Sequence, residues 1–96
     1  MNIGNAIKIL RKNANLSQKD FALKLNITQA YLSQIENNHK VPNLAIIEQI
    51  GKQMGIPVAV IMFLSINLND VDDDKKQLFE TLSPTIIKLI EDIFVD

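Results

Sequence analysis

The sequence contains no cysteine, so it can form neither a disulfide nor a thiolate metal site, and an intracellular location is the simpler interpretation. Its single histidine, His39, has no second histidine with which to hold a metal or share catalysis. No basic-then-apolar leader opens the chain, and the longest apolar run, residues 56–66, is far shorter than the ~20 residues that a membrane-spanning helix needs. These absences predict a soluble, cytoplasmic protein with no membrane partner.

Motifs for catalysis and metal binding are also missing. There is no Gly-rich phosphate loop, no Ser/His/Asp constellation and no pair of carboxylates in an apolar setting. Asp70, Asp72 and Asp74 match the first three ligand positions of an EF-hand loop. Lys75 and Thr81, however, stand where that loop needs glycine and glutamate. The sequence therefore predicts a protein that is not an enzyme and that requires no cofactor or metal.

The charge of the chain is divided unevenly along its length. With 96 residues and 47% hydrophobic content, the chain is long enough for one compact domain with a real core. Residues 1–55 carry seven Lys and Arg against three acids, a balance of +4, whereas residues 56–96 have a balance of −5. A basic first half suggests that this half meets a polyanion. Chance scatter of surface charge is the alternative.

Apolar residues recur at helical spacing through the first two thirds of the chain, and strand-like alternation is absent. The first helix is expected over residues 3–13. Ser17 offers an N-cap to a second helix that stops near Asn26, and Thr28 caps a third helix of about nine residues. Asn26 and Asn38 are expected in sharp turns, because asparagine tolerates the left-handed backbone.

A fourth and a fifth helix follow the same pattern. Asn43 caps the fourth, Gly55 ends it, and Gly51 is expected at a close backbone contact because glycine inside a helix costs ~1 kcal/mol relative to alanine. The expected buried face of this helix comprises Leu44, Ile47, Ile50, Gly51 and Met54. The fifth helix, residues 58–64, is apolar on most sides and is expected to be buried.

The acidic segment 67–74 is expected to be a linker, which divides the chain into residues 1–66 and residues 67–96. Beyond the linker, apolar residues around Phe79 predict one short helix. Ser83 followed by Pro84 is a cap with a first-turn proline, which predicts a separate last helix. That last helix carries more large apolar residues than one face of a terminal helix requires, namely Ile86, Ile87, Leu89, Ile90, Ile93 and Phe94.

The second and third expected helices are short and are joined by a tight polar turn, which is the arrangement of a helix-turn-helix unit. In such a unit the first helix crosses the DNA backbone and the second lies in the major groove. The outward face of the third helix is rich in glutamine and asparagine, whose amides can form two hydrogen bonds at once with adenine. This face therefore predicts the reading of base edges in double-stranded DNA, with solvated surface amides as the alternative.

The run RKNANLSQKDFALKLNITQAYLSQIENN, followed by Pro42, resembles the phage-repressor (Cro/repressor, XRE-like) helix-turn-helix family of transcriptional regulators. The elements of that family's pattern stand at Arg11, Leu16-Ser17-Gln18, Ala22, Ser33-Gln34-Ile35-Glu36-Asn37 and Pro42. The resemblance covers about residues 3–64. It implies an all-α fold, with a five-helix lambda-repressor-like DNA-binding domain in residues 1–66. Residues 67–96 are expected to form a short C-terminal helical extension for dimerisation, because their last helix is so apolar. Asn26 and Asn38 depart from the pattern, which generally has glycine there.

The resemblance also implies roles for individual residues. The implied DNA-contacting set is Gln18, Thr28, Gln29, Ala30, Tyr31, Ser33, Gln34, Asn37, Asn38, His39 and Lys40. Gln29 and Gln34 are the expected base readers, and Gln18 is expected at a phosphate. Arg11 and Glu36 are expected to pair with each other rather than with DNA. The alternative for Tyr31 is that it covers the second helix. The alternative for His39 is that it is simply exposed to solvent.

Together these features predict a sequence-specific transcriptional regulator, in particular a repressor that reads a palindromic operator as a homodimer with half-sites ~34 Å apart. The apolar C-terminal helix either meets a second copy or folds back on its own core. Dimerisation through residues 58–64 and 76–95 is the favoured interpretation. An antitoxin or a protein–protein interaction module with the same fold, whose partner is a toxin or another regulator, is the alternative function.

Overall fold

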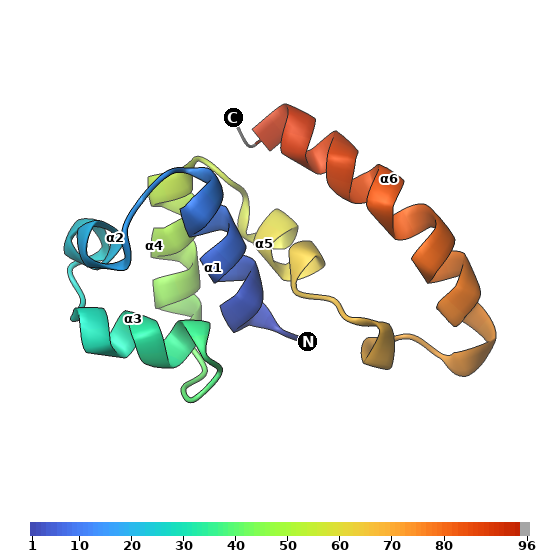
Figure 1. Cartoon of the computed structure of the whole chain (residues 1–96), viewed down its shortest axis with the longest axis horizontal. Coiled ribbons are helices and arrows are strands. Elements are labelled where there is room, and N and C mark those ends of the chain that lie inside the picture. Colours follow the sequence, from blue (N-terminus) through green and yellow to red (C-terminus); the bar gives the residue numbers. More distant parts are fainter. Residues whose placement is uncertain (95–96) are drawn as a thin grey trace.

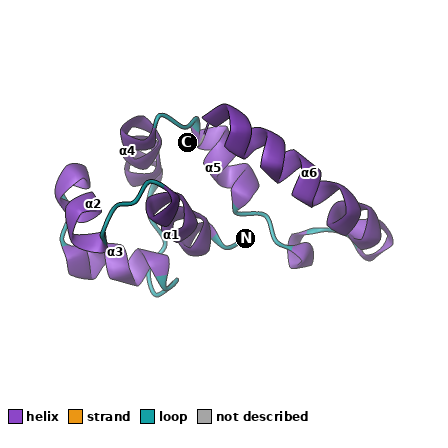
Figure 2. Cartoon of the chain, turned by 45° about the horizontal axis from the view of Figure 1, so that its top comes forward, coloured by secondary structure: helices purple, strands orange, loops and turns teal. Residues whose placement is uncertain are grey.

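The computed structural model describes residues 1–94 of the chain, and its regular elements are all helical (Figures 1 and 2). The elements are α1 (Ile3–Asn13), α2 (Gln18–Leu25), α3 (Gln29–Glu36), α4 (Leu44–Met54), α5 (Val58–Leu64), the 3-10 turns η1 (Leu68–Asp70) and η2 (Asp73–Lys75), and α6 (Lys76–Phe94). The predicted all-α class is confirmed. Residues 95 and 96, which end the predicted extension, lie outside the described residues.

Each of the first four helices begins with a side chain that caps it. The caps are Asn2, Ser17, Thr28 and Asn43. In each case the side-chain oxygen accepts a hydrogen bond, 2.9–3.0 Å long, from the backbone N–H three residues later. Each cap satisfies one of the N–H groups that a helix start leaves without a partner. The caps predicted at Ser17, Thr28 and Asn43 are confirmed, and Asn2 is an addition.

Sharp turns end three of the helices with a left-handed residue. Asn26 has a φ of 56° after α2, Asn38 a φ of 60° shortly after α3, and Gly55 a φ of 68° after α4. The two asparagines therefore occupy turns where the resemblance leads one to expect glycine, and their predicted conformation is confirmed. Asn15, between α1 and α2, adopts the same conformation with a φ of 57°, which the sequence analysis did not anticipate.

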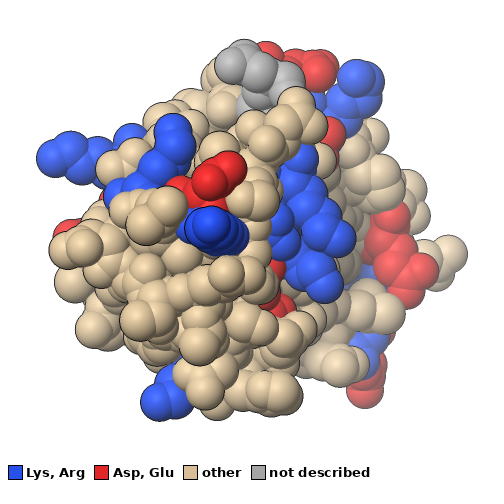
Figure 3. Space-filling model, turned by 60° about the vertical axis from the view of Figure 1, so that its left-hand side comes forward, with Lys and Arg blue, Asp and Glu red and all other residues tan. Residues whose placement is uncertain are grey.

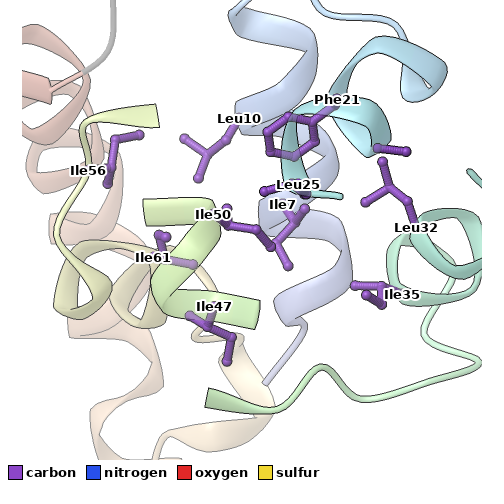
Figure 4. Packing of buried hydrophobic residues seen from close by; sticks show 11 residues of the cluster. Ile7, Leu10, Phe21, Leu25, Leu32, Ile35, Ile47, Ile50, Ile56 and Ile61 are labelled. Atoms are coloured by element: carbon purple, nitrogen blue, oxygen red, sulfur yellow. The ribbon is translucent and has the colours of Figure 1, made fainter. Parts of the chain in front are cut away.

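The core lies where the first five helices converge (Figure 4). Its buried side chains are Ile7 and Leu10 of α1, Phe21, Ala22 and Leu25 of α2, Leu32 and Ile35 of α3, Ile47 and Ile50 of α4, Ile61 of α5, and Ile56 between α4 and α5. Gly51 permits the close approach that was expected there, because a Cβ at this position would lie 2.6 Å from the carbonyl oxygen of Ile56.

Two expectations about burial were wrong. Leu44 is exposed, since the first turn of α4 extends beyond the core and only the later turns pack into it. The fifth helix is not buried on most sides. Ile61 is its one fully buried residue, whereas the other apolar residues of α5 are half-buried or exposed. A helix of seven residues at the edge of the core can turn only one side inward.

The two C-terminal helices predicted on either side of Ser83 form one helix, α6, with Pro84 inside it. The prediction failed because a cap followed by proline looks the same locally at a helix start and inside a helix. In the folded chain a continuous half-buried face crosses the proline, comprising Phe79, Ser83, Ile87, Ile90 and Phe94. Phe94 packs against the core of α1–α5. Pro84 itself is exposed, so its ring does not disturb this packing.

The start of the chain connects α1 to the segment after α5. The backbone N–H of Asn2 donates to the carbonyl oxygen of Ser65 over 2.7 Å, and the N-terminal ammonium pairs with Asp70 over 2.8 Å. The hydrogen bond from the ammonium and that from the backbone N–H of Asn67 hold the pKa of Asp70 below its usual value. These contacts anchor the segment that leads from α5 to α6.

Among the described residues, no single helix is long and apolar enough to cross a membrane. Only α4 and α5 taken together have the length and apolar composition of a membrane-spanning segment, and the two helices are bent by 102° relative to each other. The long dimension of the molecule is 42 Å, with α3 toward one end and most of α6 toward the other (Figure 1). The division into residues 1–66 and 67–96 stays a prediction.

Candidate nucleic-acid interface

The outer face of α3 is polar because its apolar residues are drawn into the core. Leu32 and Ile35 are fully buried, and they fix the rotation of α3 about its own axis. Gln29 and Gln34 consequently lie on the exposed side, together with Thr28 and Ala30. In Figure 1, α6 lies away from this side of α3, so the chain's own last helix does not cover these amides.

A buried ion pair fixes the end of α3 against α1, as predicted. Arg11 Nε donates to Glu36 Oε2 over 2.8 Å, and Arg11 Nη2 donates to Glu36 Oε1 over 3.0 Å. The same guanidinium donates through Nη1 to the carbonyl oxygen of Leu16 over 2.8 Å. Both charged residues are buried, at 8% and 5% exposure. This planar two-bond geometry holds the last turn of α3 more rigidly than a single contact could.

Gln18 extends this network toward the surface. Its Nε2 donates to Glu36 Oε1 over 3.2 Å, and its Oε1 accepts from Gln29 Nε2 over 3.5 Å. A chain of contacts thus runs from the buried ion pair to the first residue of α3. One of the two N–H groups of the Gln18 amide is used in this way, and the other is available to a phosphate. The two glutamines therefore meet at the edge between α2 and α3.

The other predicted contact residues occupy varied positions. Thr28 Oγ1 caps α3, and the hydroxyl of Ser33 accepts from Asn37 Nδ2 over 3.4 Å. Tyr31 is half-buried and packs against the core, and its place at the groove and the alternative that it covers α2 both stay predictions. The loop residues His39 and Lys40 are exposed.

Asn38 has a structural role that the sequence analysis missed. Its Nδ2 donates over 2.8 Å to Asn2 Oδ1, the same oxygen that caps α1. Gly4 makes this approach possible, since a Cβ there would collide with the carbonyl oxygen of Ile35 and with the Asn38 side chain. The end of α3 therefore rests directly on the first turn of α1. An asparagine followed by a first-turn glycine was the only local signal of this contact.

The charge around α2 and α3 suits an anionic partner. Figure 3 shows the side of the molecule that carries these helices, where lysine and arginine side chains border a broad uncharged area. Lys19 and Lys24 of α2 and Lys40 after α3 are exposed. Within residues 1–94, no three acidic or histidine side chains lie close enough together to hold a metal ion. The exposed groups here are mainly amides and ammonium groups, and the carboxylate of Asp20 on α2 is exposed as well.

The six residues predicted for dimerisation do not share one environment. Ile86, Leu89 and Ile93 are exposed, whereas Ile87, Ile90 and Phe94 are half-buried on the side of α6 that faces the core. The fold-back alternative therefore applies to one face of the helix, and the dimerisation alternative stays a prediction for the other. One face folds back on the chain's own core, and a second face is left open.

Known proteins are similar in sequence to the segment that contains this candidate interface. The sequence profile of a family described as helix-turn-helix matches residues 7–61. The chain is 36% identical over 62 residues to the immunity repressor protein of Bacillus phage phi105, which covers 65% of this chain and 43% of that repressor. It is 37% identical over 57 residues to the control protein C.MunI of Mycoplasma sp, which covers 58% of this chain and 77% of that protein.

A third relative comes from Debaryomyces hansenii. The multiprotein-bridging factor 1 of Debaryomyces hansenii is 32% identical over 56 residues, which is 58% of this chain and 37% of that factor. The chain thus spans less than half the length of the phage repressor and of the bridging factor. No solved structure matches the chain significantly.

Proposed function

Because this chain belongs to the XRE-like helix-turn-helix family of DNA-binding transcriptional regulators, we propose that it is a sequence-specific regulator that reads double-stranded DNA with α3. The observation that carries the proposal is the exposed pair Gln29 and Gln34 on a helix whose end is fixed by a buried ion pair. Base readers must be held in position, since a hydrogen bond to a base edge tolerates little displacement.

The proposed binding mode places the start of α3 in the major groove. Gln29 and Gln34 offer amides to base edges, and Ala30 is small enough to meet a thymine methyl group. Gln18, at the start of α2, contacts a phosphate through the N–H group that its internal contacts leave available. Thr28, Tyr31 and Ser33 border the groove. The loop residues Asn37, Asn38, His39 and Lys40 follow the phosphate backbone.

The proposal extends to a repressor that acts as a homodimer on a palindromic operator. Two of the relatives are named as a repressor and a control protein, which supports a regulatory role. One recognition helix contacts only a few base pairs, so two copies on half-sites ~34 Å apart give a longer and more specific site. The open apolar face of α6 supports pairing of two copies.

Selection from random duplexes tests the proposal directly. We expect the protein to enrich one motif, and we expect the affinity for that motif to fall steeply as salt rises, because each phosphate contact releases counterions. The variant with both Gln29→Ala and Gln34→Ala serves as the comparison and should lose the enrichment. If the unaltered protein enriches no motif at low salt, DNA reading by α3 is wrong.

A protein-interaction module is the second candidate, including an antitoxin that binds DNA and a toxin together. The open apolar face of α6 favours it, and one relative is named a bridging factor. Co-purification from cells separates the two candidates. A stable complex with one toxin or regulator, together with indifference to DNA at low salt, would support the module. If the protein is instead a homodimer that binds a selected operator, the protein-interaction module is no longer supported.

A further inference from the structure

The loop after α3, residues 37–40, uses all four of its backbone N–H groups inside the protein. The N–H groups of His39 and Lys40 donate to the carbonyl oxygen of Gln34 over 2.8 and 3.1 Å. The first two N–H groups of the loop donate to other carbonyl oxygens of α3. A phosphate beside this loop is therefore met by side chains, and those of His39 and Lys40 are exposed.

One side chain of this loop joins it to a different helix. Asn38 Nδ2 donates to Asn2 Oδ1 over 2.8 Å. Within residues 1–94, this is the one side-chain hydrogen bond that connects the loop to an element other than α3. In Figure 1 the loop lies beside the N-terminal end of α1. Glycine, which the family pattern generally has at this position, has no side chain with which to form the bond.

Asn2 is itself fixed from two further sides. Its Oδ1 also accepts from the backbone N–H of Asn5 over 3.0 Å, which caps α1. Its own backbone N–H donates over 2.7 Å to the carbonyl oxygen of Ser65, a residue at the end of α5 with 1% exposure. Gly4 leaves the space that the Asn38 side chain occupies. The loop is thus attached to a point that α1 and α5 hold together.

We propose that Asn2 is a positioning residue for DNA binding, which acts through Asn38 and sets where the loop 37–40 meets the phosphate backbone. The side chains of His39 and Lys40 make the phosphate contacts. Asn38 lies along the backbone as part of the loop, while its amide binds Asn2 rather than DNA. The inference rests on the proposed function, since it requires that this side of α3 meets the duplex.

Attachment of the loop affects affinity because binding is weaker when a segment has to become ordered on the DNA. The bond between Asn2 and Asn38 orders the loop before the duplex arrives. Phosphate contacts place a protein on DNA and carry no sequence information of their own. Loss of the bond should therefore weaken binding by the same factor on every duplex and leave base preference as it is.

Two substitutions break the bond from opposite sides. Asn38→Gly removes the donor and keeps a residue suited to the left-handed backbone, where φ is 60°. Asn2→Ser retracts the acceptor, because the serine oxygen lies one bond closer to the backbone, and keeps a good helix cap. We expect each variant to bind the operator and unrelated duplexes about threefold to tenfold more weakly. The double variant should lose no more than either single variant.

Salt titration provides a readout that a loss of stability does not change. Weaker phosphate contacts lower the slope of log affinity against log salt concentration, by up to about one for each contact. Partial unfolding lowers the affinity and leaves the slope unchanged. Asn15→Gly, at another left-handed position, and Asn43→Ser, at the cap of α4, are matched controls that should change neither quantity. Circular dichroism at the assay temperature shows that each variant is folded.

Unequal effects of the two substitutions would overturn the proposal. If Asn38→Gly weakens binding and Asn2→Ser does not, the Asn38 side chain contacts DNA itself. If only Asn2→Ser weakens binding, Asn2 is the residue that contacts DNA. If the two losses add in the double variant, the two residues act separately and not through their shared bond.

Hydrogen exchange in the protein without DNA separates this inference from the proposed function. The N–H groups of His39 and Lys40 should exchange at least about threefold faster in both variants, while those of α2 keep their rates. Loop rates equal to those of the wild type overturn the positioning role alone, whatever DNA the protein selects. A wild-type protein that selects no DNA, although both substitutions loosen its loop, overturns the proposed function and not the attachment of the loop.

Discussion

Arg11 and Glu36 bring opposite charges into the interior at the junction of α1 and α3. Removing two charges from water is costly, and only close, well-aligned hydrogen bonds repay it. Here the guanidinium makes two bonds to the carboxylate and one to a backbone carbonyl oxygen, so each charge is well satisfied. The pair is therefore sensitive to the loss of one partner.

Arg11→Ala should destabilise the fold by about 3–5 kcal/mol, because it leaves Glu36 buried without its counter-charge. Arg11→Met combined with Glu36→Leu should cost much less, since neither charge then remains. Urea denaturation of the two variants beside the wild type measures both values. Equal losses in the single and double variants would contradict this account.

Gln29→Ala should weaken binding to the selected operator by about 1–3 kcal/mol and relax base preference at one position. The same change at Gln53, an exposed amide on α4, is the matched control and should have no effect. Titration of each variant against the operator and against duplexes altered at single positions provides the measurement. A uniform loss across all duplexes would instead assign Gln29 to a phosphate.

The residues of the site differ in how far the sequence predicts them. The Arg11–Glu36 pair follows from the family pattern, and Asn26 follows from the backbone preference of asparagine. The contact of Asn38 with Asn2 joins residues 36 positions apart, and no periodic pattern indicates it. Contacts of this kind depend on how helices cross, which the sequence of either helix alone does not specify.

At the scale of the element, side-chain caps set the starts of α2, α3 and α4, and Gly55 ends α4. These boundaries were predictable because each signal lies within a few residues of the helix end. The course of α6 was not predictable in this way. Its half-buried face continues on both sides of Pro84, and Phe94 at the end of this face packs against the core of α1–α5. Tertiary packing therefore outweighs a local stop signal.

Pro84→Ala should stabilise the protein by about 1–2 kcal/mol. Alanine restores a helical N–H donor, and part of the gain is offset by the greater freedom of the unfolded chain. Thermal unfolding followed by circular dichroism gives the value, and Thr85→Ala, the neighbouring exposed position, is the control. A lower melting temperature for Pro84→Ala would mean that a bend at this proline is required.

At the scale of the whole molecule, the proposed dimer has to present two α3 helices to one face of the duplex. Inserting five base pairs between the half-sites turns one of them by about half a helical turn, to the opposite face. We expect this insertion to weaken binding by at least about tenfold. An insertion of ten base pairs leaves both half-sites on the same face, so any loss of affinity there comes only from the greater distance between them. Gel-shift titration of the three operators gives the comparison, and indifference to all insertions would indicate monomeric binding.

The proposed reading helix, α3, and most of α6 lie toward opposite ends of a molecule 42 Å long. Changes in one are therefore free to accumulate without disturbing the other. A cell that holds several such regulators can keep their subunits from mixing by varying α6, whatever the targets of their α3 helices. Exchanging α6 between two regulators should accordingly change which subunits pair with each other and leave the DNA sequence preference of each regulator unchanged.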